Sequence, residues 1–428
     1  MRTSILKTLD NKSQFKIKLL NWSQQFREVI FMDSNDYHQN YSSYDYILAV
    51  DSFTSIKTDF INAFDDLKQY HQVTKDWLFG YLSFDLKNDI EVLHSNNFDG
   101  LDFPDLFFFQ PKKIFLVKGN QLEIQYLNMC DEEVEEDFAA ILETQNPEIK
   151  IKDPITIEQR ISKEKYLEKV TKILDYIHRG DIYEANFCME FYAQNTMINP
   201  LRKFQKLNEI SKPPLAVFLK NNKHFLLCAS PERYLKKVGE QLISQPIKGT
   251  SKRFLDSIED EKSKNKLAND TKERAENIMI ADLVRNDLSK TAQKGSVKVE
   301  ELCGIYSFEQ VHQMISTITS KLDDKYSVIE AIKTTFPMGS MTGTPKVSVM
   351  KIIEEMEETK RGLYSGAVGY FTPTGDFDFN VVIRSILYNQ ENKYVSFSVG
   401  SAITTQSVPE KEYEECLLKA KAMREVLS

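Results

Sequence analysis

The sequence predicts a soluble protein that mixes strands and helices around a large core. Its 428 residues are enough for one large assembly of helices and strands, or for two or three domains. Strand-like runs occur in both halves of the chain, for example at 46–50 and 394–403. Helical periodicity is clear at 162–177 and at 272–290.

Composition excludes several classes of function. The net charge is -8 and the pI is near 5.5, with basic residues spread among acidic ones, which is not typical of proteins that bind nucleic acid or anionic membranes. No apolar run reaches the roughly 18 residues of a membrane helix, and the first residues are too polar for a signal peptide. The five cysteines form no CxxC pair, which indicates reduced thiols and no zinc site. We therefore expect a cytoplasmic protein without nucleic-acid or membrane partners.

The N-terminal part alternates short strands with helices and carries little obvious chemistry. Helices are expected at 58–70 and, in an acidic stretch, at 131–143, while strands are expected at 46–50, 77–84, 113–117 and 121–126. A polar connector with two prolines follows at 144–154. We place a domain boundary there, which divides the chain into an N-terminal subdomain (1–154) and a C-terminal domain (155–428).

The C-terminal domain opens with a well-marked helix. Ser162 is a suitable N-cap, apolar residues repeat at helical spacing, and Gly180 stands just past the end. Strands are expected next, at 182–191, 215–219 and 224–229. The spacing between Glu232 and the stretch 245–250 suits a hairpin that brings Glu232 beside Lys248.

Lys248 stands in the stretch Gln-Pro-Ile-Lys-Gly-Thr at 245–250. Proline fixes φ before it, and Gly249 after it lets the backbone approach a ligand closely, so the lysine is held by its neighbours. A lysine attacks as a nucleophile at neutral pH only if burial or a nearby cation lowers its pKa. The alternative from these six residues alone is an ordinary surface lysine.

Two helices near the C-terminus carry pairs of glutamates at i and i+3. The helix at 272–290 bears Glu273 and Glu276, and the last helix bears Glu412 and Glu415 with Lys419 a turn later. A capping box of Ser407 and Glu410, with Pro409 in the first turn, is expected to start that last helix. Taken alone, such pairs are more often solvated faces than metal ligands.

Other candidate residues lie between these helices. His312 falls in a strand-like run at 308–319, where a core histidine is the simpler interpretation. A Gly-, Ser- and Thr-rich loop at 336–346 leads through Pro345 into a helix, whose N-terminus suits an anion but does not match a nucleotide-binding P-loop. A hairpin is expected at 364–388 with Arg384 on its second strand, where a buried ion pair is an alternative role.

Together these stretches resemble the chorismate-utilising enzymes, which include anthranilate synthase component I, aminodeoxychorismate synthase component I, isochorismate synthase and salicylate synthase. The matching motifs occur in the family's order as GDIYEANF, SPE, PIKGT, KERAENIMIADLVRNDL, FEQVHQMISTIT, FPMGSMTGTPK, RGLYSGAVGYF, VVIR and EKEYEECLLKAK. The run FGYLSFDLKNDIE in the N-terminal part is also similar. The resemblance implies an α+β fold, an antiparallel β-sandwich wrapped by helices, with a C-terminal domain that binds chorismate.

The resemblance also implies roles for individual residues. Members with PIKGT use the lysine covalently to form 4-amino-4-deoxychorismate, whereas PIAGT or PLAGT is usual in anthranilate and salicylate synthases. Lys248 thus matches the nucleophile and Glu232 the general acid. Glu276 and Glu415 match direct Mg²⁺ ligands, and Glu273 and Glu412 belong to the same acidic set. The remaining positions match groups of the substrate pocket: Arg384 and Tyr364 for the enolpyruvyl carboxylate, and Thr342, Gly400 and Lys419. His312 also matches a pocket position, and we count it with Lys248, Glu232 and Glu184 among the candidate catalytic residues.

Three positions depart from the family pattern. Glu184 stands where amine-forming members have Gln and water-adding members have Lys, which argues against isochorismate or salicylate formation. Two roles are open for this carboxylate: it accepts a proton from the incoming ammonium, or it bonds the backbone. Ser401 and Ala402 after Gly400 replace a glycine-richer turn, and Met338 replaces a frequent glycine, so substrate contacts there are in doubt.

The expected function is amination of chorismate to 4-amino-4-deoxychorismate, for 4-aminobenzoate and folate synthesis. No cysteine sits in a G-x-C-x-G turn, so ammonia is expected from outside or from a separate glutamine amidotransferase subunit. Two alternatives remain: an anthranilate synthase component I, which Lys248 disfavours, and a non-catalytic tryptophan-sensing homologue.

Overall fold

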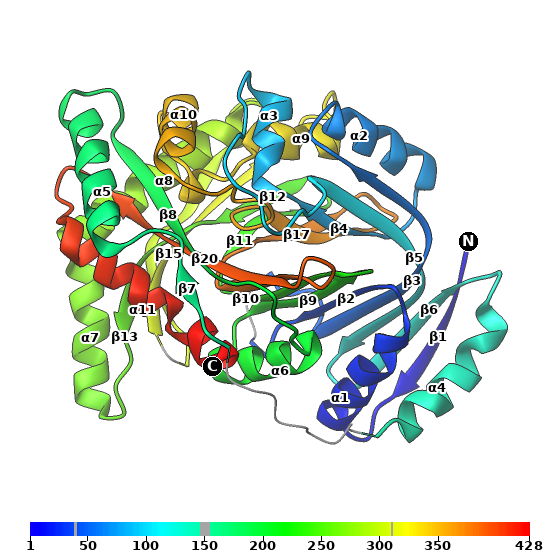
Figure 1. Cartoon of the computed structure of the whole chain (residues 1–428). Helices are drawn as coiled ribbons and strands as arrows, with labels where there is room; N and C mark the ends of the chain where they lie inside the picture. The colour runs from blue at the N-terminus through cyan, green and yellow to red at the C-terminus, as the bar shows by residue number, and fades with distance from the viewer. Residues whose placement is uncertain (38–40, 146–154, 310) are drawn as a thin grey trace.

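The computed structural model describes residues 1–37, 41–145, 155–309 and 311–428 (Figure 1). All pairings between its named strands are antiparallel. The strands form two layers with helices around them. The long strands β3 (Tyr46–Thr58) and β5 (Leu106–Lys118) run through both layers. This arrangement confirms the expected α+β fold.

The first layer contains most of the long strands. Neighbouring strands in order are β1 (Arg2–Thr8), β6 (Gln121–Leu127), β5 (Leu106–Lys118), β3 (Tyr46–Thr58), β2 (Glu28–Asp33), β9 (Leu215–Asn221), β10 (His224–Ser230), β19 (Ser385–Asn389), β20 (Tyr394–Ile403) and β8 (Glu184–Ala193), with β7 (Glu158–Gln159) and β16 (Gly343–Thr344) beside β8.

The second layer begins on the other half of β5, which pairs with β4. From there the order is β4 (Leu78–Leu82), β17 (Ala367–Phe371), β18 (Phe377–Val381), β11 (Arg233–Val238), β12 (Gln241–Gln245) and β15 (Val311–Lys321), which also pairs with β13 (Ile247–Lys252) and β14 (Lys298–Ser307). Strands from before residue 146 therefore lie in both layers.

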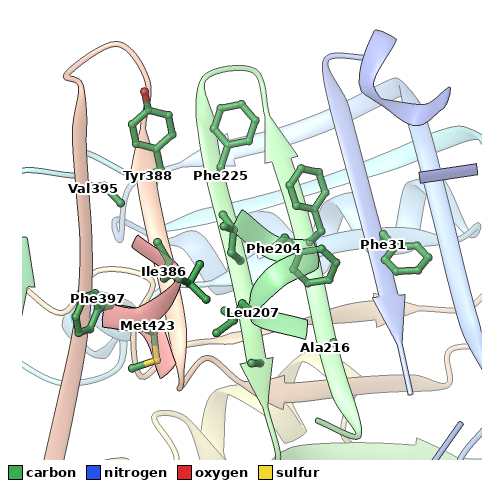
Figure 2. Packing of buried hydrophobic residues seen from close by; sticks show 14 of the residues in the cluster. Phe31, Phe204, Leu207, Ala216, Phe225, Ile386, Tyr388, Val395, Phe397 and Met423 are labelled. Carbon is green, nitrogen blue, oxygen red and sulfur yellow. The ribbon is translucent and has the colours of Figure 1, made fainter. Parts of the chain in front are cut away.

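The central strands of the first layer, such as β2, β9 and β10, are buried on both faces. Along β2, Val29 and Phe31 join a core beneath helices, while Ile30 joins the core between the layers. Successive side chains of a strand point to opposite faces, so a continuous apolar run is what such a strand requires. Figure 2 shows the helix-covered core, with Phe204 and Leu207 of α6 and Met423 of α11 against the strands.

Helices cover the outer faces of both layers. Those in the cores beside the first layer are α1 (Lys12–Trp22), α4 (Val134–Glu143), α5 (Lys163–His178), α6 (Pro200–Ser211), α10 (Lys346–Met356) and α11 (Pro409–Leu427). The others are α2 (Ala63–Thr74), α3 (Lys87–Ile90), α7 (Ser257–Asn269), α8 (Thr271–Ser289) and α9 (Val328–Thr335). No helix within the described ranges combines the length and the apolar character needed to cross a membrane.

Three expected local structures are wrong. The helix expected at 58–70 begins only at Ala63, because the pairing of β3 with β5 continues to Thr58. Arg384 is not on the second hairpin strand; that strand ends at Val381, and Arg384 has a φ of 53° in the link to β19. The last helix has no capping box, because Pro409 is its first residue and Val408 its N-cap. The expected domain boundary falls in 146–154, outside the described residues, and stays a prediction.

Candidate active site

The centre of the site is an ion pair between Lys248 on β13 and Glu184 at the start of β8. The Lys248 ammonium donates to Glu184 Oε1 at 2.8 Å. The Glu184 side chain is 1% exposed and that of Lys248 is 11% exposed, so the pair is shielded from water. This excludes the interpretation of Lys248 as an ordinary surface lysine.

Close backbone contacts set the position of both residues. Gly249 has a φ of +96°, and a Cβ there would lie 3.1 Å from Glu273 Oε2, so glycine lets β13 approach α8. The Asn277 amide on α8 donates to the carbonyls of Lys248 (3.2 Å) and Met314 (3.1 Å). Gly343 has a φ of +137°, and a Cβ there would lie 2.1 Å from the Glu184 carbonyl oxygen. Two glycines thus permit the approach of the elements that hold the pair.

The charges around Lys248 do not lower its pKa. Burial lowers the pKa, but the carboxylates of Glu184, Glu276 and Glu232 outweigh burial, and the pKa is raised above 10.5. The expectation of a lowered pKa is therefore wrong for this set of neighbours. Lys248 rests as an ammonium, and it needs a proton acceptor before it can attack; Glu184 is in hydrogen-bond contact with it.

Glu232 is a buried carboxyl group suited to donate a proton. It lies between β10 and β11, and the Ser340 hydroxyl donates to its Oε1 at 2.6 Å. Burial raises its pKa to about 7, against the opposing effects of the Ser340 hydrogen bond and of Lys248. The charge of Lys248 therefore lowers the pKa of Glu232, which agrees with the expected closeness of these two residues. At neutral pH a large share of Glu232 carries its proton.

The four glutamates predicted for Mg²⁺ come together around one ammonium group. Lys272 Nζ lies 3.7 Å from Glu276 Oε1 and 3.6 Å from Glu412 Oε1. Burial lowers the pKa of Lys272, but the charges of Glu276, Glu412, Glu273 and Glu415 raise it overall. Two separate helices, α8 and α11, therefore direct their carboxylates to one place.

The donor chemistry of this acidic set fits Mg²⁺. Carboxylate oxygens are the ligands that this ion prefers, and it keeps several waters. Glu276 Oε1 is buried and, among the residues described, has no hydrogen-bond partner. Burial raises the pKa of Glu276 to about 7, so a further cation would favour its charged form. In the described part of the chain, no three His, Cys, Asp or Glu side chains already form a complete ligand set.

A second group of predicted residues lies beside the middle of α11. Arg384 Nη1 donates to the Lys419 carbonyl at 3.3 Å, and burial lowers the pKa of Arg384 while Tyr364 and Glu415 oppose that effect. Lys419 Nζ donates to the Gly400 carbonyl at 2.8 Å and to Glu415 Oε1 at 2.6 Å. Five predicted residues are thus neighbours, and they include two cations that could hold a carboxylate.

The structure gives Thr342 and His312 contacts of another kind. The Thr342 hydroxyl donates to the carbonyls of Met338 (3.2 Å) and Gly339 (3.3 Å), which shapes the loop after α9. His312 contacts Ser307 Oγ through Nδ1 at 2.8 Å and Asp260 Oδ1 through Nε2 at 3.1 Å. Both ring nitrogens are engaged away from Lys248, and a catalytic role for His312 stays a prediction.

Comparison with known proteins decides the family. A family model described as chorismate binding enzyme matches residues 27–425. The chain belongs to the chorismate binding enzyme family. It is therefore an enzyme that uses chorismate, as its motifs predicted.

Individual members of the chorismate binding enzyme family are similar over most of their length. Aminodeoxychorismate synthase component 1 of Bacillus subtilis (strain 168) is 34% identical over 361 residues, which cover 81% of this chain and 76% of that protein. Anthranilate synthase component 1 of Thermus thermophilus is 32% identical over 356 residues, which cover 80% and 76%. The structure of anthranilate synthase component I from Streptococcus pneumoniae TIGR4 has a TM-score of 0.79 at 24% identity, covering 91% of this chain and 93% of that one. That likeness supports the fold alone.

Three residues of this chorismate binding enzyme's site were missed in the sequence. Ser340 contacts the predicted acid, Asn277 holds the β13 backbone, and Lys272 lies among the glutamates. Each stands inside a matched motif. Lys272 and Asn277 had a usable signal, since they directly flank the first glutamate pair, whereas Ser340 had none.

Proposed function

We propose that this enzyme aminates chorismate at C4 and forms 4-amino-4-deoxychorismate, the step toward 4-aminobenzoate and folate. The observation that carries the proposal is Lys248, only 11% exposed, which bonds Glu184 and lies within the electrostatic reach of Glu232 in a chorismate binding enzyme. The relative from Bacillus subtilis, named aminodeoxychorismate synthase component 1, supports it.

In the proposed first step, Lys248 gives a proton to Glu184 and attacks C2 of chorismate. The C1=C2 electron pair moves to C1=C6, the C5=C6 pair moves to C4=C5, and the C4–O bond breaks. Hydroxide is a poor leaving group, so Glu232 protonates it as it departs, and water leaves. The pKa of about 7 makes Glu232 a proton donor at neutral pH.

In the proposed second step, ammonia attacks C4 and the π electrons shift back. The C2–N bond to Lys248 breaks, the amine leaves with the electron pair, and the C4 amino product forms. A covalent intermediate of this kind divides one difficult substitution into two easier ones.

The remaining residues are proposed to bind and orient the substrate. The Arg384 guanidinium and the Tyr364 hydroxyl are assigned to the enolpyruvyl carboxylate, a planar target for a guanidinium group. Glu276 and Glu415, supported by Glu273 and Glu412, are assigned to Mg²⁺. When bound, this ion would neutralise negative charge near the C1 carboxylate of chorismate.

Anthranilate formation is the second candidate, because the relative from Thermus thermophilus is named anthranilate synthase component 1. Lys248 separates the two, since direct attack by ammonia at C2 needs no lysine there. A non-catalytic role is disfavoured, because Glu232, Lys248 and the acidic set of four glutamates are all present in one site.

We further propose that the enzyme acts in the cytoplasm and receives ammonia from a separate glutamine amidotransferase. One incubation tests the reaction itself: purified enzyme with chorismate, Mg²⁺ and ammonium, with identification of the product. 4-Amino-4-deoxychorismate is expected. Anthranilate as the main product would replace the proposal with the second candidate.

A further inference from the structure

Glu184 has one oxygen in use and one that is free for a ligand. Oε1 accepts from Lys248, while Oε2 is buried and has no hydrogen-bond partner among the described residues. An ionised carboxylate can accept about four hydrogen bonds, and a buried oxygen without a donor is destabilising. The second oxygen is therefore suited to a donor that arrives during the reaction.

A second buried acceptor stands beside it. Thr344 is directly opposite Glu184 in the pairing of β16 with β8, and directly opposed residues place their side chains on one face of the sheet. Thr344 Oγ1 is also buried without a hydrogen-bond partner in the described part of the chain. Two neighbouring acceptors without donors favour a small guest that is rich in N–H groups.

The local charge favours a cation. The Lys248 ammonium is coupled to three carboxylates, those of Glu184, Glu276 and Glu232. Of these three, Glu276 belongs to the acidic set beside Lys272, and Glu232 carries its proton for a large share of the time at neutral pH. The carboxylate of Glu184 itself favours a positively charged donor at its free oxygen, because hydrogen bonds between charged groups are stronger than those between neutral groups.

We propose that Glu184, with Thr344, binds the ammonium ion, so that the nitrogen substrate enters the site as NH₄⁺ and is converted to NH₃ there. The inference rests on the proposed amination, and it identifies which form of the nitrogen substrate is recognised. Glu184 is then a catalytic residue that touches substrate, and Thr344 is a binding residue.

The atoms and charges of the second step balance. After the first step Glu184 holds the proton of Lys248, and Glu232 is ionised because its own proton left with the hydroxyl as water. The proton on Glu184 then passes to Glu232, the other carboxylate near Lys248, so both groups return to their starting forms. One N–H bond of ammonium breaks and its proton moves to the ionised Glu184, and the electron pair of the resulting ammonia forms the N–C4 bond. The C2–N bond to Lys248 breaks, and the lysine, which was a secondary ammonium in the adduct, leaves as a neutral amine. Lys248 then takes the proton from Glu184 across the 2.8 Å contact, which restores the resting ion pair.

The wild-type enzyme alone provides the first test. We would measure the KM for total ammonium, added as ammonium chloride, between about pH 7 and pH 8.5, where most of it is NH₄⁺. If NH₄⁺ binds, this KM stays constant within about twofold. If NH₃ binds instead, the KM for total ammonium falls about tenfold per pH unit, because the neutral fraction grows. That result would overturn the inference.

Glu184→Gln provides the second test, since it keeps the shape of the side chain and removes its charge. At pH 7 we expect the KM for total ammonium to rise by about tenfold to a hundredfold, with a chorismate KM within about twofold of wild type. The KM of this variant should also fall with pH in the manner of NH₃ binding. Equal ammonium KM values and equal pH profiles in variant and wild type would overturn the inference.

Glu190→Gln is the matched control. Glu190 lies on the same strand, is buried, and pairs with Arg160 at 3.0 Å, away from Lys248. Its ammonium KM should be that of wild type, and thermal unfolding checks that both variants fold. An enzyme that forms no product that depends on ammonium would overturn the proposed amination together with this inference. Product formation with the pH profile of NH₃ would overturn the ammonium site alone.

Discussion

Lys248 and Glu184 are 64 positions apart in the chain, yet their side chains meet at 2.8 Å. Lys248 comes from β13 of the second layer and Glu184 from β8 of the first. The contact therefore joins the two layers, and the site depends on how they meet. The predictions below test the residues around this contact.

Glu232 is expected to set the alkaline limit of activity. Burial raises its pKa to about 7, so the proton needed for departure of the hydroxyl is lost as the pH rises above that value. We expect kcat/KM for chorismate to fall about tenfold per pH unit there. Glu232→Gln should lower kcat by about 10² to 10⁴ and remove this limb of the pH profile.

Ser340→Ala gives a directed check on the same assignment. The Ser340 hydroxyl donates to Glu232 and lowers its pKa, so removing it should move the alkaline limb to higher pH. If the alkaline fall in kcat/KM stays at the same pH in both Glu232→Gln and Ser340→Ala, it belongs to a group other than Glu232.

Gly343→Ala is expected to destabilise the protein and to disturb Glu184. An added Cβ would lie 2.1 Å from the Glu184 carbonyl oxygen, and the φ of +137° already disfavours alanine. We expect a loss of more than about 2 kcal/mol in the free energy of unfolding, measured by denaturant titration. Gly375→Ala is the control, because Gly375 also has a positive φ but an added Cβ meets no atom within 4 Å. Equal losses in the two variants would refute the steric argument.

The sequence allowed the fold to be predicted, and it indicated candidate site residues whose roles stay predictions, but most of the contacts of these residues could not be predicted. The motifs indicated Lys248, Glu232 and the four glutamates, because those residue types recur at fixed places in the family. The raised pKa of Lys248 was not predictable, since Glu184 and Glu276 come from distant elements. The position of Arg384 was also missed, because its positive φ breaks the strand that its neighbours favour.

Activity is expected to require Mg²⁺. Glu276→Ala and Glu415→Ala should each lower turnover by more than about 100-fold, because each removes a carboxylate from the acidic set. Asp282→Ala is the control on α8, since Asp282 is exposed and pairs with Arg285 one turn later on the same helix. Titration with magnesium chloride after treatment with EDTA measures the requirement. Full activity in EDTA would contradict it.

The purified enzyme should use ammonium but not glutamine. The sequence contains no G-x-C-x-G turn that would supply a glutaminase nucleophile. Product formation with each nitrogen source is to be measured, before and after addition of a glutamine amidotransferase. Glutamine-dependent product from this chain alone, in a preparation free of amidotransferase, would refute the prediction.

The central claim is that Lys248 forms a covalent bond to the substrate ring. The direct measurement is mass spectrometry of enzyme mixed with chorismate and Mg²⁺ in the absence of ammonia, followed by peptide mapping. We expect an adduct on the peptide that contains Lys248, and no adduct in Lys248→Ala, whose product should shift toward 2-amino-2-deoxyisochorismate or anthranilate. A wild-type enzyme without adduct, together with a Lys248→Ala variant that makes the 4-amino product at an undiminished rate, would contradict the covalent mechanism.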